Sequence, residues 1–322
     1  MTKNGMFKPV NMGPSRIAEA LISGIRSAIM TAILLAAIGI MNNAIVTNGV
    51  GNGFSLMIAQ WSQGSLALAI VLIAIASLVL GMGLPVTAAY IILAILTAPA
   101  LAGLMADGVI VEQLIQGISD PSQSALFFLV DHPLALQVTG GMTKAEAWSL
   151  IRAIPFEVAV TIRPVMVDPA LQTTFLLTAH LIIFWLSQDS NVTPPVCLAA
   201  FVAAGIAGSR PMKTGFESWK IAKGLYIVPL LFAYTPLISG ELIEVLQIGF
   251  FALFGIYATN ALIQWYAEGP IGWVTAPLLG LGAVGAYWPL AFLPNLVGAV
   301  VILGVIIWTS RTEMRPLAEN GG

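Results

Sequence analysis

One short segment of the chain decides its fold: Gly81-Met82-Gly83-Leu84-Pro85-Val86-Thr87. It separates two apolar arms, 66–80 and 88–104, and each arm is short for a complete membrane span. In one interpretation the arms are two complete spans joined by a tight turn at the membrane surface. In the other they form a re-entrant hairpin whose tip lies near mid-membrane, where irregular backbone is tolerated against protein or an aqueous cavity. Because a surface turn usually carries polar residues and this one is mostly apolar, the sequence favours the hairpin.

A second interruption lies at Ser187–Pro195, between the apolar stretches 175–186 and 196–207. The consecutive Pro194 and Pro195 remove two backbone donors, which disfavours a continuous helix. The two apolar stretches together are long enough for one span. The sequence therefore predicts one discontinuous span with an unwound polar middle.

Both interruptions free backbone carbonyls, and the helix ends beside them add partial charges. Carbonyl oxygens together with the oxygens of Thr87, Ser190, Asn191 and Thr193 suit a hard cation such as sodium. Discontinuous helices of this kind mark substrate and ion sites in secondary transporters. The alternatives are a plain conformational turn at the first interruption and a proline kink with satisfied polar groups at the second.

Two titratable residues are further candidates. Asp189 is an acid in an otherwise apolar region, and an intramembrane acid is a functional hypothesis by default. Its alternative role is to face a water-filled vestibule. His180 lies on the apolar helix before the second interruption, where packing is the commoner role of a histidine.

The composition sets the class of protein. Charged residues make up 9% of the 322 residues, against roughly 25% in an average soluble domain. Hydrophobic residues make up 58%, and the mean hydropathy is +0.93. The chain is therefore expected to be an integral membrane protein with several spans. A net charge of -2 without a basic stripe excludes nucleic-acid binding, and the absence of nucleophile, phosphate-binding and dinucleotide motifs argues against an enzyme.

Charge and hydropathy divide the chain into expected regions. These are a basic cytoplasmic tail at 1–26, a first span plus the hairpin at 27–105, an acidic periplasmic insertion at 106–173, the discontinuous span at 174–208, and C-terminal spans with a tail at 209–322. Four further spans are expected at 224–239, 245–263, 271–286 and 288–308. Basic segments then lie inside and acidic ones outside, as the positive-inside rule requires, and both termini are cytoplasmic. This charge pattern does not separate a hairpin from paired spans.

Two groups of residues resemble a known family. Gly81–Tyr90, with Ala98-Pro99-Ala100 downstream, resembles a motif of the tripartite ATP-independent periplasmic (TRAP) transporter permeases. Asn191–Phe201 and Ala203–Gly208 resemble the second motif of that family, which Pro211–Phe216 continues. The similarity is greatest to the fused permeases that work with TAXI-type binding proteins. It covers about 66–104 and 175–240, and the last spans resemble the C-terminal extension of the fused type.

The resemblance implies a function. It implies an elevator-type permease that imports an organic acid, delivered by a periplasmic TAXI-type binding protein, with sodium as the coupling ion and no other cofactor. In the family the first motif is the tip of a hairpin and the second is an unwound helix. Carried over by motif, the residues that line the sodium and substrate site are Gly81, Gly83, Pro85, Thr87, Asn191, Thr193 and Pro194.

The chain departs from the family pattern in two respects. It matches only the second of two inverted repeats, and 106–173 resembles an insertion. The expected fold is therefore an all-α integral membrane protein, one inverted-repeat half of an elevator-type transporter, with a re-entrant helical hairpin, a discontinuous transmembrane helix and four further C-terminal spans. It would work in the bacterial inner membrane with a second permease part that carries the missing repeat and with a small membrane subunit. The alternative is a non-transporting scaffold or assembly subunit, or a truncated permease fragment.

Overall fold

The computed structural model describes residues 13–130, 132–195, 197–289 and 291–319, and these residues are almost entirely helical. Apart from one isolated bridge between Tyr266 and Pro270, they contain no strand. Four helices among them are long and apolar enough to cross a membrane: Val86–Gln116, Pro169–Asn191, Leu242–Gln264 and Phe292–Arg311. Together with the scarcity of charge, these helices identify an integral membrane protein.

The chain divides into two compact units, residues 1–50 and 51–322, which are described separately. The first unit contains one long helix, α1 (Pro14–Thr47), with a proline in its first turn. Proline is favoured there because its missing N–H would have no partner in the helix. The helix begins inside the segment 1–26 that we expected to be a tail.

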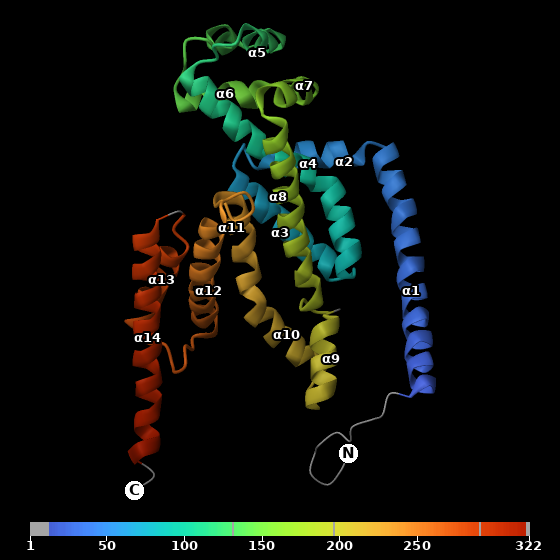
Figure 1. The fold of residues 1–322 in the computed structure, drawn as a ribbon, viewed down its shortest axis with the longest axis vertical. Coiled ribbons are helices and arrows are strands. Elements are labelled where there is room, and N and C mark those ends of the chain that lie inside the picture. The colour runs from blue at the N-terminus through green and yellow to red at the C-terminus, as the bar shows by residue number, and fades with distance from the viewer. Residues whose placement is uncertain (1–12, 131, 196, 290, 320–322) are drawn as a thin grey trace. The chain divides into compact units, whose positions relative to one another are not determined.

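The second unit opens with a helical hairpin. After α2 (Val50–Trp61), α3 (Leu66–Gly81) and α4 (Val86–Gln116) pack against each other and against α8 (Figure 1). The interruption between α3 and α4 falls at the predicted segment. The second arm is longer than predicted, because α4 continues past 105 and includes the first part of the expected insertion.

The remainder of that insertion folds around a core of its own. It contains α5 (Pro121–Ala125), η1 (Leu126–Leu129), η2 (Pro133–Gln137), α6 (Lys144–Ala153) and α7 (Phe156–Met166). Its core consists of fully buried apolar side chains from α4, η1, α6 and α7, among them Ile110, Leu114, Phe127, Leu150 and Ile162. Removing these side chains from water stabilises the region as a small helical domain at one end of α4.

The second predicted interruption is also present as a break in the helix. α8 (Pro169–Ser187) passes into the 3₁₀ turn η3 (Gln188–Asn191), and α9 (Leu198–Ala207) begins after an irregular segment. The peptide bond between Pro194 and Pro195 is cis. The next elements are α10 (Pro211–Ile221), η4 (Ala222–Tyr226) and α11 (Ile227–Tyr234).

The structure corrects two of the four expected C-terminal spans. In place of a span at 224–239, α11 has 8 residues, which cover only about 12 Å. It ends at Tyr234, and the backbone of the next residue, Thr235, is extended because the following Pro236 disfavours a helical conformation there. α13 (Thr275–Ala286) has 12 residues and is likewise short for a span.

The other two expected spans correspond to α12 (Leu242–Gln264) and α14 (Phe292–Glu319). α13 packs closely on α14 (Figure 1). A Cβ atom at Gly298 would clash with the backbone nitrogen of Ala286, so only glycine allows this approach. Small residues at such contacts are typical of helix packing in membranes.

Candidate functional site

The two interruptions contact each other. A Cβ atom at Gly81 would lie 3.1 Å from both Cα and Cβ of Ser190, so the end of α3 rests directly on η3. α4 contacts η3 as well. The structure therefore joins the hairpin turn and the unwound helix, which are far apart in the sequence, into one cluster that we call the interruption cluster: residues 81–87 and 187–195.

Asp189 is the charged centre of the interruption cluster. Its side chain is 1% exposed. The Thr193 hydroxyl lies 2.5 Å from Asp189 Oδ2 and 2.7 Å from the Asp189 carbonyl oxygen. Because a hydroxyl has one proton, it donates to one of these two oxygens at a time. Within the described residues, Asp189 Oδ1 makes no hydrogen bond that meets the usual geometric limits. A buried carboxylate oxygen without a donor is costly, which makes it a candidate ligand for a cation.

Backbone carbonyls lie beside this carboxylate. A helix would pair the carbonyls of Ser190 and Asn191 with the N–H groups four residues later, but those positions are Pro194 and Pro195. Proline carries no N–H, so both carbonyl oxygens are released from helical pairing. The Ser190 hydroxyl donates to the Ser187 carbonyl at 3.0 Å. The cluster thus combines one carboxylate with several neutral oxygens.

The remaining predicted site residues differ in exposure. Pro194 is buried, and Asn191 is half-buried with its Nδ2 3.4 Å from Gln188 Oε1. Gly83, Pro85 and Thr87 are exposed on the hairpin turn, and a Cβ atom at Gly83 would meet nothing within 4 Å. The structure brings Gly81 against the second interruption and leaves these three residues on the open side of the turn.

His180 has a different partner. Its Nδ1 lies 3.1 Å from the hydroxyl of Tyr90, which joins α8 to α4. His180 precedes Asp189 by about two and a half helical turns, or roughly 13 Å. Its observed contact is therefore with the second arm of the hairpin.

Two residues that the sequence did not single out act on Asp189. The Lys223 ammonium and the Tyr226 hydroxyl, both on η4, interact electrostatically with its carboxylate. Lys223 Nζ also lies 3.5 Å from the centre of the Trp219 ring, a cation–π contact that helps to hold it. Sequence alone assigned Lys223 to a basic loop, and the packing of η4 against the neighbouring helices is what places it here.

The segment Pro211–Phe216, which continues the second family motif, packs against the interruption cluster. A Cβ atom at Gly215 on α10 would lie 2.7 Å from Cys197 Sγ and 3.4 Å from Pro194 Cγ. Glycine therefore lets α10 seat against the start of α9. Cys197 is buried in this contact.

An all-helical membrane protein in which two helix interruptions meet around an unpaired carboxylate oxygen has the architecture of a secondary transporter. Residues 5–238 match a protein family described as the tripartite ATP-independent periplasmic transporter, DctM component. The chain belongs to this family, which is one of transporter permeases and not of enzymes. Members generally work with a periplasmic binding protein and a small membrane subunit. No curated protein and no solved structure matches the chain.

Proposed function

We propose that this permease component imports an organic acid together with sodium, and that the interruption cluster is its binding site. The observation that carries the proposal is the contact of Gly81 with Ser190 beside the unpaired Oδ1 of Asp189. In this proposal α3 and α4 form a re-entrant hairpin, and the cluster crosses the membrane by an elevator movement.

The oxygen atoms of the cluster support sodium as the coupling ion. Unwound backbone carbonyls coordinate sodium in discontinuous transporter helices. Here the released carbonyls of Ser190 and Asn191 lie in the same turn as Asp189 Oδ1. Hydroxyls of Ser190, Thr193 and Thr87 are further donors, with Gly81, Gly83, Pro85 and Pro194 shaping the backbone around them.

The charges near the cluster support an anionic substrate. Lys223 supplies a cation beside Asp189. The sequence alone had not indicated that this lysine lies near Asp189. α4 and α9 both begin without a side-chain N-cap, so their first amides remain available to a carboxylate. A bound sodium ion would add positive charge at the same place. His180 lies farther away, and in this proposal it binds neither sodium nor the substrate.

The proposed partners follow the family resemblance. They are a periplasmic TAXI-type binding protein, a small membrane subunit and a second permease part that carries the missing repeat. The chain would lie in the bacterial inner membrane with both termini cytoplasmic. The acidic region 106–173 would then be periplasmic, where a substrate-delivering protein can reach it.

Uptake by the complete assembly tests this function. Vesicles that contain the chain and its partners should accumulate a radiolabelled organic acid when sodium is outside and not when choline replaces it. The double variant Thr87→Ala/Thr193→Ala should lose sodium-dependent uptake, and Thr173→Ala, on the exposed face of α8, should keep it. Uptake that survives the double variant unchanged would disprove the site assignment.

The second candidate is a non-transporting scaffold or assembly subunit that keeps the fold without the transport cycle. The 8-residue α11 favours it, because this helix is too short to cross a membrane alone. A complex that assembles with all partners, yet shows no uptake under any ion gradient, would favour this candidate over the transporter.

A further inference from the structure

A cleft of about 570 Å³ opens beside the middle of α4, away from the interruption cluster at the start of that helix. It lies between α2, α4, α6 and α7, and Asp107 on its wall is roughly 30 Å along α4 from Thr87. No residue of the interruption cluster lines it. Its volume is in the range of small-molecule sites, about 300–1,000 Å³.

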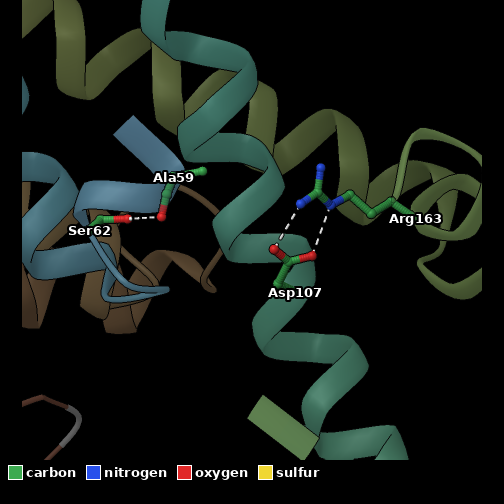
Figure 2. Close-up of polar contacts among 4 residues, drawn as sticks. All are labelled: Ala59, Ser62, Asp107 and Arg163. Carbon is green, nitrogen blue, oxygen red and sulfur yellow. Dashed lines mark hydrogen bonds and ion pairs between the residues drawn. The ribbon is translucent and has the colours of Figure 1, made fainter. Parts of the chain in front are cut away.

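An ion pair forms part of the cleft wall. Arg163 on α7 donates from Nε to Asp107 Oδ1 and from Nη2 to Asp107 Oδ2, both at 2.8 Å. Figure 2 shows this forked contact, with the third guanidinium nitrogen directed away from the carboxylate. A Cβ atom at Gly103 would lie 3.0 Å from Arg163 Nη1, so glycine makes room for the guanidinium against α4. The pair fixes one positively charged group in the wall of the cleft.

A second arginine lines the same cleft, and none of the side chains that the structure describes forms an ion pair with it. Arg152, at the end of α6, is exposed, and its guanidinium carbon lies 6.0 Å from the centre of the Trp148 ring. Among the described lining residues, Arg152 and Arg163 are the cations and Asp107 is the anion. Because Asp107 balances Arg163, the charge of Arg152 is left over, and the cleft attracts anions.

The rest of the lining is largely apolar. Trp148 contributes an aromatic surface, and Leu104, Ile151 and Ile154 contribute aliphatic ones. The amides of Gln60 and Gln63 on and beside α2 add hydrogen-bonding groups. A suitable ligand therefore carries one negative group for a guanidinium and a compact apolar body for the walls.

We propose that this cleft is a second binding site, for a small organic carboxylate with an aromatic or branched apolar body. Arg152 binds the carboxylate, since a planar guanidinium matches its two oxygens. Trp148 packs against the apolar body, and the Asp107–Arg163 pair holds the wall on which both depend. Binding at this cleft does not rest on the proposed transport function, whereas a role as receiving site for the transported acid does.

Equilibrium dialysis of radiolabelled benzoate with the full chain in a neutral detergent tests the proposal. Benzoate should bind saturably, and neutral benzamide of the same shape should not compete. Arg152→Gln should weaken binding at least about tenfold, the loss expected for one charge-assisted hydrogen bond. Lys144→Gln removes the same charge from the same helix outside the cleft and should leave the affinity unchanged. Trp148→Ala should weaken binding as well, while far-UV circular dichroism shows that both variants stay folded.

Three results would overturn the inference. The first is equal benzoate affinity in the wild type and in Arg152→Gln. The second is benzoate binding that disappears in Asp189→Asn but persists in Arg152→Gln, which would place the carboxylate at the interruption cluster. The third is Arg152-dependent binding of phosphatidylglycerol that benzoate does not displace, which would identify a lipid headgroup. Loss of sodium-dependent uptake with benzoate binding intact would count against the proposed function alone.

Discussion

Gly81 and Ser190 lie in direct contact, and a side chain at position 81 would fit only if Ser190 gave way by a few tenths of an ångström. A Cβ atom there would lie 3.1 Å from the Cα and the Cβ of Ser190. Ser190 belongs to the turn that holds the buried Asp189. The hairpin turn and the unwound helix are therefore mechanically joined at the point where the unpaired carboxylate oxygen lies.

Substitution Gly81→Ala should separate the two interruptions. The added methyl group meets the Cα and Cβ atoms of Ser190, which side-chain rotation does not move, so the expected loss is about 1–3 kcal/mol of stability. Melting followed by circular dichroism in detergent measures it. Gly83→Ala is the matched control, because a Cβ atom there meets nothing within 4 Å. Equal melting temperatures for the two variants would show that the contact does not constrain the cluster.

Substitution Thr193→Val should remove the Thr193 hydroxyl donor from Asp189. The buried Oδ2 then loses its 2.5 Å contact, at an expected cost of about 1–3 kcal/mol. Thr193→Ser keeps the hydroxyl and should retain most of the stability. A valine variant as stable as the serine variant would mean that Asp189 finds another partner or is protonated in the wild type.

Substitution Asp107→Asn should loosen the small helical domain from α4. Arg163 would keep a half-buried charge without its forked partner. Because the side chains of Arg163 and Asp107 remain 25% and 10% exposed, the expected cost is about 1–3 kcal/mol, below that of breaking a fully buried pair. The double variant Asp107→Asn/Arg163→Gln removes both charges and should recover part of the loss. Additive losses in this double-mutant cycle would rule out coupling between the two residues.

Acid should weaken the start of α6. The Thr143 hydroxyl and backbone N–H hydrogen-bond to the Glu146 carboxylate and lower its pKa from the ordinary value of 4.5. A lowered pKa in the folded state means that the stabilisation is present above pH 4.5 and is lost as the pH falls through the folded-state pKa. Glu146→Gln removes this titration. The melting temperatures of wild type and variant should therefore converge or cross between pH 6 and pH 3, and parallel curves would refute the assignment.

The two interruptions were predictable because glycine and proline act locally. Gly81, Pro85 and the pair Pro194-Pro195 disfavour a continuous helix through their own backbone chemistry. The same reasoning, applied to Pro236, would have shortened the span that we expected at 224–239. There the apolar composition outweighed a breaker that the structure shows to be decisive.

The contacts between elements were not predictable from one sequence. Nothing local pairs Gly81 with Ser190, or Asp107 with Arg163, since the partners come from separate helices. Asp107 had been assigned to an insertion outside the membrane, yet it lies on the same helix as the hairpin arm. Lys223 had been counted as a loop charge, and only the packing of η4 brings it within electrostatic reach of Asp189.

Sodium binding to the purified chain tests the central claim most directly. A ligand that binds only the folded state raises its melting temperature with concentration. Sodium chloride should therefore raise the melting temperature above that in choline chloride of equal ionic strength. In Asp189→Asn the sodium concentration needed for half of that rise should be at least about tenfold higher, because the variant removes a charged ligand. Identical melting in the two salts, or an unchanged sodium response in Asp189→Asn, would contradict a sodium site at the joined interruptions.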